Sequence, residues 1–97
     1  GETAARQLAD LRQWVNHILI RQYPGYELAT CWHRHIHAIW ELSTLAAEWQ
    51  RIYLPPKPSL DRALDFYDRF LPHTMARVAE FTRKCSMRCV IPGNPLF

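Results

Sequence analysis

Apolar residues recur at three- and four-residue intervals along most of the chain, a pattern that predicts helices and no strands. The first such stretch covers residues 4–22. Its apolar stripe comprises Leu8, Leu11, Val15, Ile18 and Leu19. Thr3 stands where an N-cap is expected, and the turn residues from Tyr23 to Tyr26 end the pattern. We therefore expect a first helix over residues 4–22.

The longest amphipathic pattern runs over residues 31–54, with Thr30 as the expected N-cap. Its apolar stripe comprises Ala38, Ile39, Leu42, Leu45, Ala46, Trp49, Ile52 and Tyr53. Three prolines within residues 55–58 cannot continue a helix and predict a stiff link.

A third helical pattern begins after Ser59, an expected N-cap, with Asp61 in the first turn. Its expected buried face comprises Leu60, Ala63, Leu64, Tyr67, Phe70 and Leu71. Past Pro72 the pattern continues through Met75, Val78, Phe81, Thr82 and Cys85. This favours either one helix kinked at Pro72 or two helices, 60–71 and 72–87, with Pro72 opening the second. An extended tail is expected over residues 90–97.

The predicted fold is all-α: residues 1–97 form one domain, a small antiparallel bundle of three to four helices. The short links between the helices imply antiparallel neighbours, and 48% of the residues are apolar, which supplies a core. No apolar run approaches the roughly 20 residues that a membrane span requires, so no membrane association is expected. Three cysteines make no disulfide framework, which indicates reduced thiols and the cytoplasm.

Two groups of cysteine and histidine residues offer the most distinctive chemistry, one in residues 31–37 and one in residues 85–89. At 100° per residue, Cys31 and His35 share the stripe of Leu42. His33 and His37 point the other way, towards solvent. An exposed histidine pair four residues apart is more often a plain surface feature than a metal site.

Topology connects the two groups. The second helix rises by roughly 35 Å, and an equal rise from Ser59 brings the chain back level with Cys31 near residues 82–86. Cys31, His35, Cys85 and Cys89 are thus expected at one end of the bundle, where four ligands of thiolate and imidazole type suit a structural Zn²⁺. Alternatively, Cys31 and Cys85 are small core residues, and a disulfide from Cys31 to Cys85 or Cys89 is a weaker option.

No enzyme is predicted, and no small-molecule substrate is inferred. Cys31 with His35, and His73 near Asp68, are formally available for catalysis, but no oxyanion loop or glycine-rich phosphate cradle accompanies them. His73 instead suits a hydrogen bond to a carbonyl left open beside Pro72.

A net charge of +3 with both signs interspersed does not by itself indicate nucleic-acid binding. Candidate phosphate contacts are Arg34, Arg77, Arg83, Lys84 and Arg88. The later ones fit equally well as the polar side of a helix, near a C-terminus that favours cations.

Three tryptophans, Trp14, Trp32 and Trp40, do not all fit the core stripes and are candidate interface residues. A second copy of so short a chain would complete a fourth face of the bundle. The alternative is that these rings cap the edges of the core.

From Cys31 to Cys89 the chain resembles a small family of unassigned function from actinobacteria, their plasmids and their phages. The shared features are Cys31-Trp32, His35 or His37, Trp40 with Trp49, the segment 66–68, Pro72-His73 and a late cysteine, Cys85 or Cys89. The proline link at 55–58 and the basic segment after His73 depart from the pattern. The resemblance implies an accessory protein of a mobile genetic element and no assigned activity.

These observations predict a non-enzymatic protein that acts by binding. The first expected partner is another protein or a second copy of the chain. Nucleic acid is the alternative, and a structural zinc site is the second alternative.

Overall fold

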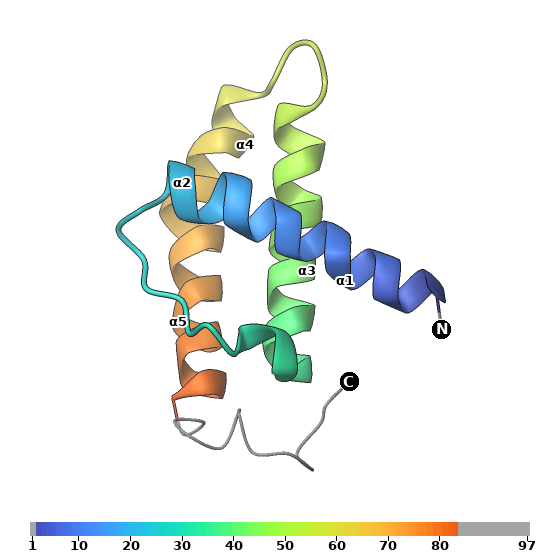
Figure 1. The fold of residues 1–97 in the computed structure, drawn as a ribbon. Helices are drawn as coiled ribbons and strands as arrows, with labels where there is room; N and C mark the ends of the chain where they lie inside the picture. Colours follow the sequence, from blue (N-terminus) through green and yellow to red (C-terminus); the bar gives the residue numbers. More distant parts are fainter. Residues whose placement is uncertain (1, 84–97) are drawn as a thin grey trace.

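The computed structural model describes residues 2–83, and all regular structure in this range is helical (Figure 1). The elements are α1 (Glu2–Trp14), η1 (Val15–Leu19), α2 (Ile20–Gln22), η2 (Trp32–Arg34), α3 (Ile36–Tyr53), α4 (Leu60–Asp65), η3 (Phe66–Phe70) and α5 (Leu71–Thr82). The all-α class is thereby confirmed for the described residues. None of these helices combines the length and apolarity that crossing a bilayer requires.

The first helical run covers Glu2 to Gln22, where a helix over residues 4–22 was expected. The elements α1, η1 and α2 follow one another without a break, and the run ends where Tyr23 leaves helical geometry. Thr3 lies inside α1, so its expected role as N-cap is wrong. The buried side of the run carries Leu11, Trp14, Val15 and Leu19, and it crosses over α3 (Figure 1).

The long central helix begins later than predicted. Residues 32–34 form a 3₁₀ turn, in which the N–H of His35 donates to the carbonyl of Trp32 (3.1 Å), and His35 is extended. Thr30 is therefore not the N-cap; His35 occupies that position before Ile36. This tighter turn accompanies burial of the Trp32 ring in the core.

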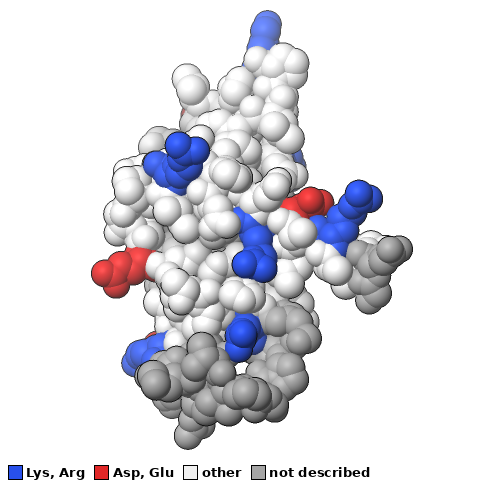
Figure 2. Space-filling view, viewed as in Figure 1, with Lys and Arg blue, Asp and Glu red and all other residues white. Residues whose placement is uncertain are grey.

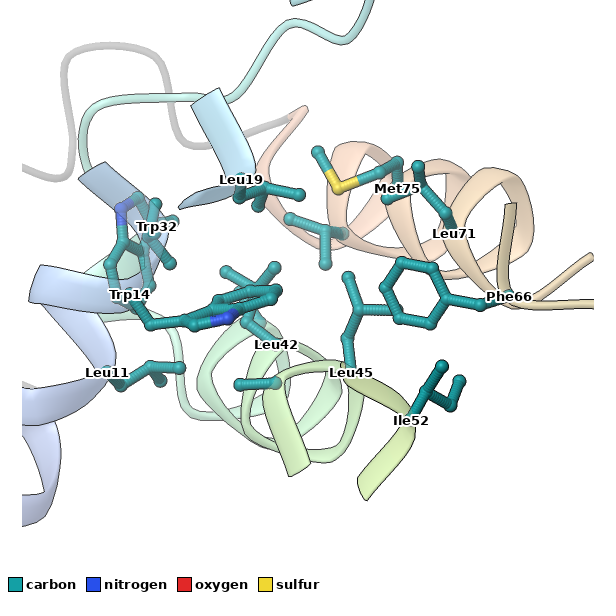
Figure 3. Packing of buried hydrophobic residues seen from close by; sticks show 14 residues of the cluster. Leu11, Trp14, Leu19, Trp32, Leu42, Leu45, Ile52, Phe66, Leu71 and Met75 are labelled. Atoms are coloured by element: carbon teal, nitrogen blue, oxygen red, sulfur yellow. The ribbon is translucent and has the colours of Figure 1, made fainter. Parts of the chain in front are cut away.

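The central stripe of α3 is confirmed. Ala38, Leu42, Leu45, Ala46 and Ile52 are buried, and they pack between the first helical run and α5 (Figure 3). Ile39 and Trp49 are partly buried against the same core. The stripe follows the sequence because no turn interrupts the 3.6-residue period of this helix.

The buried face of the last helical run differs from the prediction. Leu60, Leu64, Tyr67 and Phe70 are exposed, whereas Phe66 is fully buried. Residues 66–70 form a π-helical turn, which inserts extra backbone and rotates the residues after it. Leu71, Met75 and Val78 beyond the turn are buried as predicted, and Ala63 before it is partly buried, but Leu60 and Leu64 turn outwards. Phe81, also expected in the core, is exposed.

The start of this run is as predicted, because the Ser59 hydroxyl accepts a hydrogen bond from the N–H of Arg62 (3.3 Å). Pro72 lies in the first turn of α5, with helical residues on both sides, and a kink there stays a prediction. The described part of α5 ends at Thr82; the remainder of the predicted helix 72–87 and the tail 90–97 lie outside the described residues.

A chain of aromatic rings ties the first helical run, α3 and η3 together. Trp14 meets Trp49 edge-on (centroids 6.1 Å apart), and Trp49 contacts Tyr53 (5.2 Å). Tyr53 meets Phe66 (6.4 Å), and Phe66 contacts Tyr23 (6.0 Å). Such offset and edge contacts add to the stability that ring burial supplies. The crossing of α1 over α3 is therefore fixed by specific side chains.

Candidate functional site

The Cys–His group lies in the turn that leads into α3. Trp32, buried in the core, anchors this turn, and the polar residues on either side of it are half-buried. Cys31 Sγ lies 3.6 Å from Nε2 of His35. The two residues were expected to meet as neighbours on an α-helix; they meet instead across the 3₁₀ turn of η2. The thiol of Cys31 is free.

The rest of the expected metal site cannot be placed. Cys85 and Cys89 lie outside the described residues. Within residues 2–83, three or more candidate metal ligands do not come together anywhere. Phe81, four residues before Cys85, does stack on His37, two residues after His35 (centroids 5.0 Å apart). The end of α5 and the Cys31–His35 pair therefore lie at one end of the molecule (Figure 1).

His33 and His37 do not form the exposed pair that the sequence predicts. The extended backbone at His35 separates them: His33 packs edge-on against Trp32 (5.9 Å), whereas His37 belongs to α3. Burial, and then the guanidinium groups of Arg12 and Arg34, lower the pKa of His33. Burial and the two cations thus both disfavour the charged form of His33.

A second candidate site lies along α3 and α5 where no residue of α1 lines the surface, and we call it the α3–α5 face. It comprises His37, Trp40, Glu41, Thr44, Glu48 and Arg51 from α3, with Phe70, Arg77 and Phe81 from η3 and α5. A groove of about 190 Å³ runs between the two helices on this face, and no residue of α1 lines it.

One end of the α3–α5 face is aromatic. Trp40 is 59% exposed, and its ring meets the ring of His37 edge-on (5.4 Å). His37 in turn stacks on Phe81 with an interplanar angle of 25°. The exposed tryptophan is therefore held by a stacked pair that joins α3 to α5.

The middle and the other end of this face carry paired charges. Arg77 Nε donates to Glu41 Oε1 across the two helices (2.7 Å), and Arg51 pairs with Glu48 on α3 (2.9 Å). Two glutamates and two arginines thus balance one another, although the chain as a whole is positive. Phe70 lines the groove at this second end.

The predicted interface residues separate into two groups. Trp14 and Trp32 are buried in the core, so their expected exposure is wrong; the fold turns both rings inwards against α3. Trp40 alone of the three is exposed. Phe70 and Phe81 were assigned to the core and are exposed instead. Phe70 and Phe81 share a helical stripe with Thr74 and Arg77, and this stripe can be identified in the sequence. The sequence does not show that the π-helical turn leaves both rings exposed.

The candidate phosphate contacts do not form a free basic stripe within residues 2–83. Arg77 pairs with Glu41, Arg83 pairs with Glu80 (2.8 Å), and Arg34 lies beside His33. Figure 2 shows the basic side chains of one face as separate spots. Lys84 and Arg88 lie outside the described residues. His73 is exposed on α5.

Comparison of the chain with protein-family models, with curated proteins and with solved structures gave no match.

Proposed function

We propose that this domain acts by self-association through the α3–α5 face. The observation that carries the proposal is the exposed ring of Trp40, fixed beside His37 and Phe81 on a helix pair that α1 covers from one side only. Tryptophan is one of the residue types enriched among those that dominate binding energy. A second copy would supply the missing layer of a larger antiparallel bundle.

The charges of the face favour a second copy as the occupant. A two-fold axis through the middle of the groove brings the aromatic end of one copy onto the Arg51 end of the other. Trp40 then meets a guanidinium group, an attractive cation–π arrangement. Because the acidic and basic residues of the face are equal in number, two such faces do not repel each other.

The test is the solution mass of the 97-residue chain by sedimentation equilibrium, from low to high micromolar concentration. We expect a reversible dimer, which Trp40→Ala weakens at least about tenfold, as for a dominant interface residue. Tyr26→Ala, which removes an exposed ring from the loop between α2 and η2, is the matched control and leaves the mass unchanged. A monomer throughout this range would refute self-association. An accessory role in a mobile genetic element belongs to the same proposal.

A structural zinc site is the second candidate, because one distance in the structure is compatible with it. Ligands bound to tetrahedral zinc at about 2.3 Å (sulfur) and about 2.05 Å (nitrogen) lie about 3.6 Å apart. The distance from Cys31 Sγ to His35 Nε2 is 3.6 Å. Cys85 follows Thr82, the last residue of α5, by three residues. Three residues span at most about 11 Å, so Cys85 lies within that distance of the end of α5. We propose Cys85 and Cys89 as the remaining ligands, in a reducing compartment such as the cytoplasm.

Metal analysis of protein purified without chelator tests this second candidate. We expect one zinc per chain, lost in Cys31→Ser and in Cys85→Ser but retained in His17→Ala, which alters an exposed histidine on η1. Removal of zinc with a chelator is expected to lower the unfolding temperature of the wild-type chain. Wild-type protein without zinc, folded and with the same unfolding temperature in chelator, would contradict the assignment.

A further inference from the structure

A second apolar surface lies on α4 and the start of η3, away from the α3–α5 face. Leu60 and Leu64 are one helical turn apart and are 83% and 60% exposed. Tyr67, three residues further on, continues the same line and is equally exposed. We call these three residues the α4 stripe. Two leucines exposed to this degree on one helix face form a surface that a partner would bury.

An acidic row runs beside the α4 stripe. It comprises Asp61, Asp65 and Asp68, each one residue after a member of the stripe, and all three are exposed. Within residues 2–83 none of them takes part in an ion pair. Two exposed cations, Arg62 and Arg69, follow Asp61 and Asp68 directly, and Arg69 lies over the ring of Phe70 (5.8 Å to the centroid). The stripe is therefore bordered by three carboxylates, and the two arginines lie on the far side of them.

We propose that the α4 stripe and its acidic row bind an amphipathic helix of a partner protein whose apolar side is bordered by lysine or arginine. Leucine and tyrosine side chains supply the apolar contact, and the carboxylates select a basic border. The chain carries a net charge of +3, so its overall charge repels a cationic partner. Attraction must then come from the local acidic row. A preference for a basic over an acidic partner helix would therefore report on this row.

Other occupants fit this surface less well. Two copies that pair antiparallel through their stripes bring equivalent edges together, so that the acidic rows face each other. Nucleic acid and anionic membranes carry the same sign of charge as the row. A basic helix satisfies both the apolar and the charged part of the surface.

The test uses the full chain and a fluorescent synthetic helix of leucine and lysine, with leucine at positions i, i+3, i+4 and i+7. A matched helix with glutamate for lysine is the control ligand. We expect fluorescence anisotropy to show salt-sensitive binding of the lysine helix and no binding of the glutamate helix. Leu60→Ser with Leu64→Ser is expected to weaken binding at least about tenfold.

Charge variants test the acidic row separately. Asp61→Asn with Asp65→Asn is expected to weaken binding several-fold and to reduce its salt dependence, whereas Asp10→Asn, an exposed site on α1, leaves both unchanged. All of these residues are exposed, and circular dichroism checks that each variant is folded. Equal binding of the two helices, or unchanged binding by the leucine variant, would overturn the proposal. So would a lower solution mass of the leucine variant, which would assign the stripe to a second copy.

Discussion

The backbone N–H of Leu71 donates a hydrogen bond to the carbonyl of Phe66, five residues earlier, and both side chains are fully buried. An ordinary α-helix places residues five apart on different sides. The π-helical turn brings these two onto one side. It thereby leaves Leu64 and Tyr67 in solvent.

The stability of two alanine variants distinguishes the observed buried face from the one predicted by periodicity. Phe66→Ala is expected to lower the free energy of unfolding by about 3–5 kcal/mol, because a buried ring is replaced by a cavity. Leu64→Ala is expected to change it by less than about 0.5 kcal/mol, since Leu64 is exposed. Urea unfolding measures both. A larger loss of stability for Leu64→Ala would indicate that the face predicted from regular helical spacing is the buried one.

The ion pair between Glu41 and Arg77 contributes little to stability. Both side chains are partly exposed, so solvent screens their attraction in spite of the 2.7 Å separation. A double-mutant cycle with Glu41→Gln and Arg77→Gln is expected to give a coupling energy of about 0.5 kcal/mol that declines with added salt. The same cycle on Glu80 and Arg83 is the control for a pair within one helix. A coupling unaffected by salt would contradict this view of the face.

The folded state is expected to lose stability as the pH falls through 6.5, partly through His33. Burial, Arg12 and Arg34 lower its pKa below the ordinary value of 6.5. Between the lowered pKa and 6.5, the unfolded chain therefore binds more protons than the folded chain, which favours unfolding. Urea midpoints measured from pH 7.5 downwards are expected to fall less in His33→Gln than in wild type. The exposed His17→Gln serves as control, and an identical pH dependence in His33→Gln would contradict the prediction.

Tyr23 is expected to keep its proton in strongly alkaline solution. Burial, followed by the neighbouring Tyr53, raises the pKa of Tyr23 from 10.0 to about 12. The folded chain then holds a proton that the unfolded chain releases, so this contribution to stability is present below pH 10 and is lost as the pH rises towards 12. In a pH titration followed by tyrosinate absorbance, the component that ionises at the highest pH is expected to be absent from Tyr23→Phe. Tyr26→Phe is the control. Loss of a component that ionises at lower pH in Tyr23→Phe would contradict the prediction.

How far the sequence predicts the structure depends on the local backbone. The stripe of α3 could be predicted because Ala38 to Ile52 form one uninterrupted helix. Phe66 could not, because the π-helical turn shifts the register by an amount that apolar spacing does not show. The start at Ile36 was missed because burial of Trp32 outweighs the helical preference of its neighbours.

The candidate sites show the same division. Proximity of Cys31 and His35 follows from their spacing, since both a helical turn and the observed 3₁₀ turn bring residues four apart together. The α3–α5 face could not be predicted, because its composition depends on which aromatic rings are buried in the core. Trp14 and Trp40 both sit beside apolar stripes, and only the crossing of α1 over α3 decides that Trp14 is enclosed and Trp40 is not.

Trp14 brings a polar atom into the core along with its ring. Its indole N–H is buried and has no hydrogen-bond acceptor among the described residues. The unfolded chain hydrates this donor, and leaving it unpaired on folding costs about 1–3 kcal/mol. The fold therefore sits below its own stability optimum at this position, as natural proteins commonly do. Burial of the ring therefore comes at the expense of the hydrogen bond that its nitrogen makes with water in the unfolded chain.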